Sequence, residues 1–326
     1  MKVVLGVDVG GTTTAVGLVT SDGDVLLEAQ IPTHGDGPGG ALERVGGLIG
    51  SMMARAGERG LVVDGIGVGV PGIVDPVDGR VGEEIHHVPE LAGQPLADVL
   101  ARQFGVPVFV DNDVNALALG EWFFGLGRNA PSLVVLAPGT GFGSGIVLEG
   151  RLVRGVAGFG GELGHTTVKL DGRPCWCGGR GCLAVYASGR GIAEAARERA
   201  TLPGGAGLAA AAGGAAAITA PLVFARATAG DAVAAALVAE ACQALGAMIG
   251  TIVNGLNPEV IVVTGGVAGS FAALEASIRA AAAGYAFARA LAATRVCIVP
   301  GDKRVTMRGA AALVLYETQP SRRTHA

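Results

Sequence analysis

The sequence predicts an α/β protein with two related lobes, each built on a mixed sheet flanked by helices. Its 326 residues are enough for about two domains. Strand-like apolar runs alternate with helix-like segments, which is typical of parallel strands joined by helices. A unit of strand, Gly/Thr loop, strand, tight turn and strand also occurs twice along the chain. Such an internal repeat indicates duplicated lobes.

The repeated unit predicts hairpins at the start of each lobe. Glycine and Asp-Gly turns between apolar runs are signals of a β-hairpin. In the first copy we expect strands at residues 3–8, 15–19 and 25–27, with the loop at 10–12. In the second copy we expect strands at 133–136, 145–148 and 152–153, with the loop at 139–141.

The remaining elements follow from apolar periodicity and from Pro and Gly punctuation. We expect a first lobe at residues 1–118 and a second at 119–307, with a C-terminal helix at 308–326 that returns to the first lobe. The Gly/Ala-rich residues 203–217 are compatible with an alanine helix or with a mobile loop. The other helices are predicted at 41–56, 95–104, 114–124 and 231–256, and the other strands at 61–70, 106–110 and 259–263.

Charge and composition narrow the class of protein. The net charge is −4 and no basic stripe is present, which argues against a nucleic-acid partner. The apolar stretch 235–256 contains Glu240, Gln243 and Asn254. Because each of these is costly at a bilayer centre, the stretch predicts a buried helix and no membrane span. No signal-peptide pattern opens the chain.

Cysteine usage points to a metal site in a reducing compartment. Of the five cysteines, Cys242 and Cys297 lie in apolar sequence and are expected to be buried thiols. The other three follow the pattern C-x-C-G-x-x-G-C, and His165 precedes them. Four such ligands in a short Gly-rich segment predict a closed tetrahedral zinc site. Five cysteines, three of them in such a cluster, are typical of a protein in the reducing cytoplasm. The ligands are His165, Cys175, Cys177 and Cys182.

Three Gly-rich loops follow apolar strands. In residues 8–14, glycines allow backbone amides to approach phosphate oxygens, threonine hydroxyls add donors, and Asp8 is suited to hydrated Mg²⁺. A plain turn is the simpler interpretation of this segment alone. Residues 139–141 form the matching loop of the second lobe. Residues 264–267 follow a third strand, where a glycine pair would accommodate a purine.

Two acidic segments are candidates for chemistry. Asp111, Asn112 and Asp113 lie between a strand and a helix. One carboxylate there would cap the helix, whereas another would act as a general base toward a sugar hydroxyl. Glu162 precedes the metal ligand His165. Its carboxylate would accept hydrogen bonds from vicinal sugar hydroxyls, although a surface acid is the alternative.

Taken together, these residues resemble the ROK family of repressors and sugar kinases over residues 3–315. The resemblance implies a two-lobed actin-like, hexokinase-like ATPase fold with a small zinc knot. It implies an ATP- and Mg²⁺-dependent hexose kinase, glucokinase-like, that phosphorylates a 6-hydroxyl. The matching motifs are residues 8–12, Pro71-Gly72, Asn112-Asp113, 139–141, Glu162 to His165, the cysteine cluster and 264–266.

The resemblance also implies residue roles. Asp113 would be the catalytic base, and His165 would contact sugar while ligating structural Zn²⁺. The substrate-binding set would be Asn112, Glu162, His165 and Gly72. The nucleotide- and metal-binding set would be Asp8, Gly10, Gly11, Thr12, Thr13, Gly139, Thr140, Gly141, Gly265 and Gly266. A homo-oligomer, a dimer or a tetramer, is also implied.

Two positions depart from the family pattern. Ala184 replaces the glutamate that usually follows the knot and contacts the sugar, and Glu90 replaces a usual asparagine near the sugar side. These departures keep two alternatives open: a kinase for another hexose or an amino sugar, and a degenerate protein with little turnover. A repressor is disfavoured, because family repressors carry a helix-turn-helix ahead of the phosphate loop, whereas in this sequence that loop begins at residue 8. Polyphosphate-using relatives typically lack the knot, so ATP is the expected donor.

Overall fold

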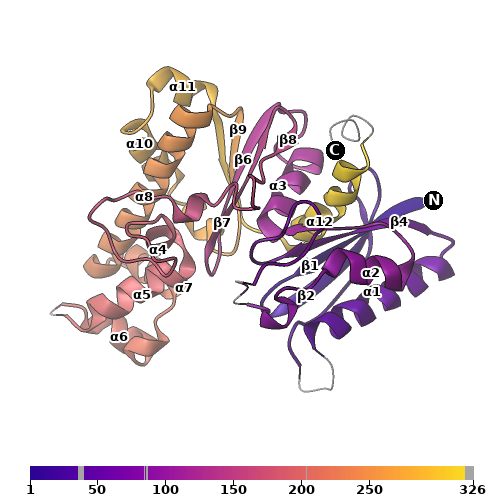
Figure 1. Ribbon diagram of the computed structural model, residues 1–326. Helices are drawn as coiled ribbons and strands as arrows, with labels where there is room; N and C mark the ends of the chain where they lie inside the picture. Colours follow the sequence, from indigo (N-terminus) through magenta and orange to yellow (C-terminus); the bar gives the residue numbers. More distant parts are fainter. Residues whose placement is uncertain (36–39, 84, 86, 203, 320–326) are drawn as a thin grey trace. The chain divides into compact units, whose positions relative to one another are not determined.

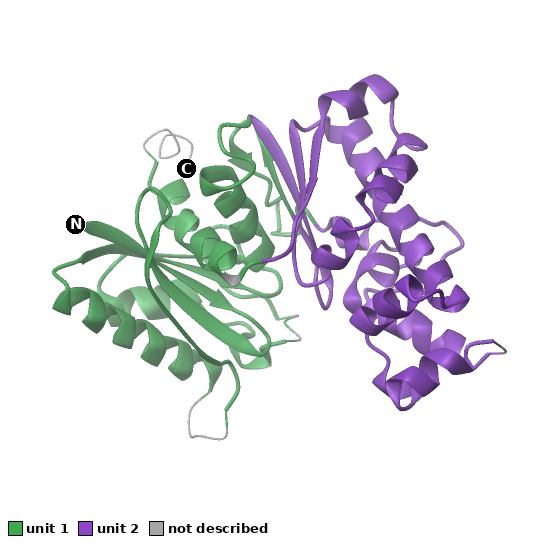
Figure 2. Cartoon of the chain, turned by 180° about the vertical axis from the view of Figure 1, so that it is seen from behind, with its two compact units in different colours: residues 1–130, 145–161, 302–326 green, residues 131–144, 162–301 purple. Residues whose placement is uncertain are grey.

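The computed structural model describes residues 1–35, 40–83, 85, 87–202 and 204–319. The chain divides into two compact units (Figure 2). Unit 1 comprises residues 1–130, 145–161 and 302–326, and unit 2 comprises 131–144 and 162–301. The expected lobes assign residues 119–130, 145–161 and 302–307 differently from this division.

Unit 1 contains a five-stranded mixed sheet in the order β3-β2-β1-β4-β5 (Figure 1). β1, β2 and β3 form the antiparallel meander that the repeated unit predicts. β1, β4 and β5 are parallel. Strands β1 and β2 are almost wholly buried, as expected of a sheet covered on both faces. The strands are β1 Lys2–Val9, β2 Thr13–Val19, β3 Val25–Pro32, β4 Val62–Val70 and β5 Val108–Asn112.

Glycines in the central strands allow the last helix to lie directly on the sheet. A Cβ at Gly6 would lie 2.0 Å from the carbonyl oxygen of Met307, and one at Gly67 would lie 1.8 Å from that of Ala310. Helix α12 therefore packs backbone to backbone on β1 and β4 and also against α3. The unit 1 helices are α1 Ala41–Glu58, η1 Pro89–Leu91, α2 Leu96–Phe104, α3 Asp113–Phe124 and α12 Lys303–Glu317.

The predicted C-terminal helix returns to unit 1, but its bounds differ from the prediction. It begins at Lys303, five positions before the expected residue 308, because Asp302 accepts a hydrogen bond from the Arg304 amide and caps it. It ends at Glu317. The rest of the predicted helix, residues 320–326, lies outside the described residues.

The second sheet has the order β10-β9-β6-β7-β8. Its strands β6, β9 and β10 are parallel, and they belong to unit 2. The strands are β6 Ser132–Pro138, β7 Phe142–Leu148, β8 Arg151–Leu152, β9 Val260–Val263 and β10 Arg295–Ile298. The mixed sheets with flanking helices agree with the predicted fold class.

The helices of unit 2 pack around the long helix α8, Ala232–Leu256. It is apolar enough to cross a membrane, yet 56% of its most apolar window is buried, and it packs against α7 and α10. Gly246 permits the α10 contact, since a Cβ there would lie 2.5 Å from the Ala281 side chain. The buried helix expected from the sequence is therefore present.

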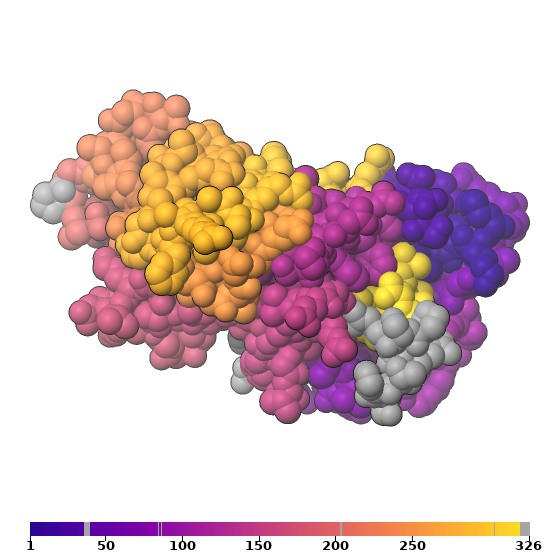
Figure 3. Space-filling view, turned by 90° about the horizontal axis from the view of Figure 1, so that it is seen from above, coloured from indigo at the N-terminus to yellow at the C-terminus, as the bar shows by residue number. Residues whose placement is uncertain are grey.

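The other unit 2 helices are short. The Gly/Ala-rich segment contains a brief helix and a 3₁₀ turn among its described residues, in place of a continuous alanine helix or a loop. The α10–α11 region lies at the surface of unit 2 in the space-filling view (Figure 3, orange). These elements are η2 Leu163–His165, α4 Ala184–Ala187, α5 Gly189–Ala200, α6 Ala206–Ala212, η3 Ala215–Ala217, α7 Ala220–Thr228, α9 Ala268–Ala272, α10 Glu275–Ala283 and α11 Ala288–Ala293.

Candidate active site

In unit 1 the candidate residues share one edge of the sheet. Asp8 on β1 pairs in register with Gly69 on β4, and Gly69 pairs with Asp111 on β5. Adjacent strands lie about 4.8 Å apart, so the turns that follow these strands are close neighbours. The carboxyl ends of parallel strands are where α/β sheets bind ligands. The loop 10–13, Pro71-Gly72 and Asn112-Asp113 all lie at this edge.

Thr33 braces the first Gly/Thr loop. Its hydroxyl donates to the Gly10 carbonyl at 2.6 Å, and its amide donates to the Thr12 carbonyl at 3.0 Å. The Gly10 amide donates to the Thr13 carbonyl at 3.1 Å, which closes a tight turn. Thr14 is wholly buried and its hydroxyl lies 3.0 Å from that of Thr33. The Thr14 hydroxyl therefore lies in the interior of unit 1, whereas Thr12 is exposed.

Asp8 is held at the end of β1. The Thr306 hydroxyl of α12 donates to Asp8 Oδ2 at 2.6 Å. This contact fixes the carboxylate beside the loop 10–13. Thr306 lies far from Asp8 in the sequence, and no sequence pattern indicated the pairing.

The cap of helix α3 is Asn112, and Asp113 Oδ1 also accepts a hydrogen bond from the Val114 amide at 2.9 Å. Asn112 Oδ1 accepts hydrogen bonds from the amides of Val114 and Asn115 at 2.9 and 3.2 Å. Its Nδ2 donates to the Gly72 carbonyl at 2.9 Å, where Gly72 has a φ of +93°. The side-chain amide of Asn112 carries a second hydrogen, so it keeps one donor beyond the Gly72 contact. Asp113, half-buried, is the first residue of the helix.

Asp111 has a structural role. Its side chain is 5% exposed, and Oδ2 accepts from Arg154 Nε at 2.6 Å. Its Oδ1 accepts from the Asn112 amide at 2.7 Å and from Asn115 Nδ2 at 2.9 Å. Arg154 also contacts Glu317 at 2.6 Å. This network holds the turn that carries Asn112 and Asp113, and sequence reasoning missed Arg154 and Glu317.

In unit 2 a second group of loops follows the parallel strands. The Val267 amide donates to the Pro138 carbonyl at 2.9 Å, which links the loop after β9 to the loop after β6. Gly265 has a φ of +138°, and a Cβ there would lie 2.8 Å from the same carbonyl. Gly301, after β10, packs against Gly265. The residues 139–141 and 265–266 therefore form one cluster.

Glycines in this cluster face open space. A Cβ built at Gly139, Gly141 or Gly266 would have no described atom within 4 Å. Packing within the unit therefore does not require glycine at these positions. Their lack of side chains leaves backbone accessible to a ligand, as phosphate loops require.

The four predicted metal ligands converge in unit 2. Their ligand atoms all lie within 4.8 Å of one another. The distances are 3.5 Å from Cys175 Sγ to His165 Nδ1 and 3.8 Å from Cys177 Sγ to Cys182 Sγ. A tetrahedral zinc with usual bond lengths requires about 3.6 and 3.8 Å for these separations. The donor set and its spacing fit this ion, and the sequence prediction of the cluster is supported.

Glu162 lies on the turn that leads to the knot. The Leu163 amide donates to Ser144 Oγ at 3.0 Å, and a Cβ at Gly164 would lie 2.0 Å from the Phe142 carbonyl oxygen. This turn is thus pressed against the start of β7. Burial raises the pKa of the Glu162 carboxyl, while nearby His165 opposes that shift. Glu162 is half-buried and is not the surface acid of the alternative interpretation.

Arg173 joins the knot to the helices behind it. Its guanidinium stacks on Tyr186 with a distance of 4.3 Å to the ring centroid. It also donates to Glu240 of α8 at 2.6 Å and to the Val185 carbonyl at 2.7 Å. These contacts secure α4, whose first residue, Ala184, is fully buried. Sequence reasoning did not identify Arg173, Tyr186 or Glu240.

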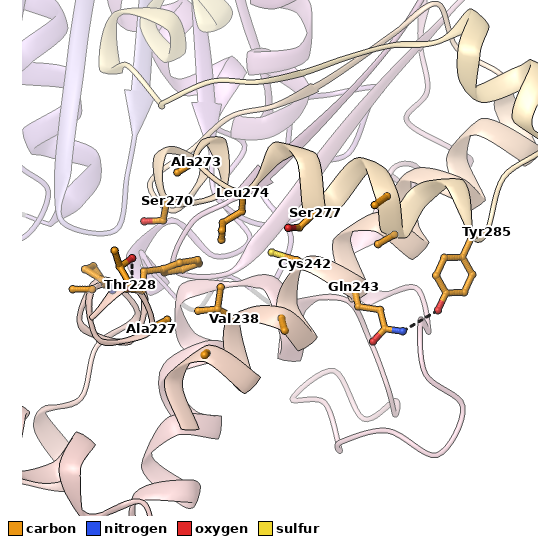
Figure 4. Close-up of a pocket in the computed structure, with 18 residues that line it drawn as sticks. Ala227, Thr228, Val238, Cys242, Gln243, Ser270, Ala273, Leu274, Ser277 and Tyr285 are labelled. Atoms are coloured by element: carbon orange, nitrogen blue, oxygen red, sulfur yellow. Dashed lines mark hydrogen bonds between the residues drawn. The ribbon is translucent and has the colours of Figure 1, made fainter. Parts of the chain in front are cut away.

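A separate groove of about 1050 Å³ lies between α7, α8 and α10 (Figure 4). None of the described residues that line it is charged. Burial raises the pKa of Cys242, on its wall, to about 11, so this thiol is protonated at neutral pH. Cys242 is buried as expected, whereas Cys297 is only half-buried. None of the candidate site residues predicted from the sequence is among the described residues that line this groove.

A family model for the ROK family matches residues 4–317. This chain belongs to the ROK family. It is 38% identical over 268 residues to a glucokinase of Halalkalibacterium halodurans, covering 81% of this chain and 80% of that protein. The match to the family model covers both groups of candidate residues.

Solved ROK structures share the fold. A ROK hexokinase from Thermus thermophilus is 31% identical, with a TM-score of 0.79 over 97% of this chain and 98% of that one. A ROK glucokinase from Streptomyces griseus, solved with glucose and AMPPNP, is also 31% identical, with a TM-score of 0.72 over 95% of this chain and 98% of that one.

Proposed function

We propose that this ROK protein is an ATP-dependent hexose kinase that transfers the γ-phosphate of ATP to the 6-hydroxyl of glucose. The observation that carries this proposal is the sheet edge of unit 1, where a Gly-Gly-Thr loop and the Asn112-Asp113 turn follow strands paired in register. The glucokinase relatives support the choice of sugar and donor. Such an enzyme would work in the cytoplasm at the entry of sugar into glycolysis.

In this mechanism Asp113 is the general base that accepts the proton of the attacking hydroxyl. Of the two carboxylates at this position, Asp111 is nearly buried and bound to Arg154. Asp113 is half-buried at the start of α3, where its Oδ1 accepts a hydrogen bond from the Val114 amide. Asn112, Gly72, Glu162 and His165 would contact sugar hydroxyls. A carboxylate such as Glu162 accepts two such bonds when ionised.

For the nucleotide, we propose that backbone amides of the Gly-rich loops hold the phosphates. The candidate residues are Gly10, Gly11, Thr12, Thr13, Gly139, Thr140, Gly141, Gly265 and Gly266. Asp8 would hold Mg²⁺, which usually takes one or two carboxylates together with substrate phosphates. When bound, this ion neutralises charge on the transferred phosphoryl group.

The Cys₃His cluster would hold structural Zn²⁺. Four protein ligands leave no open position on a tetrahedral ion, so the metal would order the loop and not activate water. His165 presents Nδ1 to the cysteines. Its Nε2 would then be the ring nitrogen left to contact a sugar hydroxyl.

A kinase for another hexose or for an amino sugar is the second candidate, and Ala184 favours it. ROK sugar kinases usually have a sugar-binding glutamate at this position. A hydrogen bond to a charged group is worth about 1.5–3 kcal/mol, so its loss would weaken glucose binding roughly 10- to 150-fold.

The test is a coupled assay of ADP release with ATP, Mg²⁺ and a panel of hexoses and amino sugars at millimolar concentration. We expect turnover that depends on sugar and is highest with glucose. A preference for an N-acetylated or other hexose would select the second candidate. Background ADP release with every sugar would overturn the kinase assignment.

A further inference from the structure

The metal knot and the unit 2 phosphate loop are connected by one short stretch of chain. Only Leu183 and the short helix α4 separate the last knot ligand, Cys182, from Ser188. Ser188 Oγ accepts a hydrogen bond from the Gly191 amide at 3.0 Å and so caps helix α5. The first turn of α5 therefore has a position that depends on the knot.

That first turn holds the loop through its backbone. The Gly189 amide donates to the Gly139 carbonyl at 2.8 Å, and the Arg190 amide donates to the Thr140 carbonyl at 3.0 Å. A Cβ at Gly189 would lie 3.0 Å from the Gly139 oxygen, so a side chain there would require the loop to move by a few tenths of an ångström. Two carbonyls of the loop are thereby turned toward α5, which helps to set the direction of the loop amides.

The side chain of Arg190 reaches back to the knot. Its guanidinium carbon lies 4.5 Å from the ring centroid of Trp176, which stands between the ligands Cys175 and Cys177. Its Nε also donates to Glu194 Oε1 at 2.7 Å. Trp176 in turn meets the His165 ring edge to face at 6.3 Å. One residue thus contacts the loop with its backbone and the knot with its side chain.

We propose that Arg190 is a positioning residue, through which the metal knot holds the loop 139–141 in the geometry that binds the phosphates of ATP. This inference rests on the proposed function, because that function assigns ATP to the loop. It predicts that the knot affects nucleotide affinity as well as sugar affinity.

The first experiment compares Arg190→Ala and Trp176→Ala with Arg199→Ala in the zinc-loaded enzyme. Arg199 is an exposed arginine of the last turn of α5 and serves as the matched control. An exposed cation–π contact corresponds to about a two- to fivefold change in affinity. We therefore expect the KM for ATP to rise by about two- to fivefold in Arg190→Ala and Trp176→Ala, while kcat and the KM for glucose change little.

Combining the two substitutions tests the contact itself. The double variant should raise the KM for ATP no more than either single variant, because both remove the same interaction. Trp176→Phe keeps an aromatic face and should restore most of the wild-type value. Zinc content is measured in each variant, so that metal loss is recognised.

Tryptophan fluorescence gives a readout independent of turnover. The chain has two tryptophans, so subtracting the signal of Trp176→Phe isolates that of Trp176. Titration with AMPPNP and Mg²⁺ should change the Trp176 emission in the wild-type enzyme and leave it unchanged in Arg190→Ala.

The outcomes separate this inference from the proposed function. If the wild-type enzyme is active and Arg190→Ala has the same KM for ATP as Arg199→Ala, the inference is wrong and the proposed function stands. Equal rises in the KM for ATP and for glucose would also overturn it, since they indicate general loosening of the knot. If no sugar is phosphorylated, the function fails, and the AMPPNP titration still decides the inference: an unresponsive Trp176 refutes it.

Discussion

At the scale of single residues, three adjacent polar residues at the junction of β5 and α3 have different tasks. Asp111 is nearly buried and bound to Arg154, Asn112 caps α3, and Asp113 begins that helix. The sequence showed that an acid here could be a cap or a base. It could not distinguish the three, because they share one local signal and differ only in their distant partners.

Asp113→Asn tests the proposed base. Loss of a positioned base should lower kcat about 10²- to 10⁴-fold, while the KM for sugar changes little. Steady-state kinetics with the preferred sugar measure both, and Asp98→Asn, an exposed acid on α2, is the control. Equal losses of binding and turnover would contradict the assignment.

Arg154→Met tests the network behind the turn. Removing one partner of a buried ion pair leaves the other uncompensated, which typically costs about 3–5 kcal/mol. We expect a loss of this size in the free energy of unfolding from urea denaturation. Arg304→Met, which breaks an exposed pair with Glu28, should have little effect. Similar stability of the two variants would mean that Asp111 is satisfied without Arg154.

At the scale of elements, the knot and the sheet illustrate different limits of sequence reasoning. The cysteine spacing predicted a metal cluster because all its ligands lie within one short segment, and their ligand atoms do converge. The hairpins β1–β2–β3 were equally visible, since each is local. The contacts of Arg173 with Tyr186 and Glu240 could not be predicted from the sequence, because Glu240 belongs to α8, which is distant from Arg173 in the chain.

Removal of the metal should expose the knot thiols. Cys175 and Cys182 are buried and, as zinc ligands, the three knot cysteines would resist thiol reagents. After chelation we expect three additional thiols to react with an aromatic disulfide reagent, and the KM for sugar to rise. The Cys242→Ser variant should give the same increment. Full reactivity before chelation would show that the protein binds no metal there.

Gly67→Ala tests the close approach of α12 to the sheet. The added methyl would meet the Ala310 carbonyl, and overpacking of this kind costs about 1–3 kcal/mol or more. Gly47→Ala on helix α1, where a Cβ meets no described atom within 4 Å, should be neutral or stabilising by up to about 1 kcal/mol. Thermal melts compare the two. A stable Gly67→Ala variant would indicate that α12 is free to shift.

At the scale of the whole molecule, unit 1 is assembled from three separate stretches of the chain (Figure 2). Its last stretch contributes α12, which covers β1 and β4 and supplies Thr306 to Asp8. The sequence predicted that a C-terminal helix returns to the first lobe. Its contacts depend on Gly6 and Gly67, which precede their helix partners Met307 and Ala310 by 301 and 243 positions.

Truncation after Gly301 tests this dependence. Without α12, the apolar face of β1 and β4 is exposed to solvent, and Arg154 loses its contact to Glu317. We expect the shortened chain to be insoluble or to lack cooperative unfolding, as judged by circular dichroism. A chain ending at Gln319 is the control and should behave as the full-length protein. Native-like unfolding of the shortened chain would show that unit 1 does not need its last helix.

The sequence by itself determined the elements whose signals are local: the repeated hairpins, the Gly-rich loops, the buried helix α8, the Cys₃His set and the family resemblance. Only the tertiary structure decided which neighbouring acid is structural, which threonine is buried, and how the knot connects to the loop 139–141. The physical reason is that hydrophobic period, turn chemistry and ligand spacing act over a few residues. The environment of Asp111 or Arg190, in contrast, depends on groups that folding brings from distant parts of the chain.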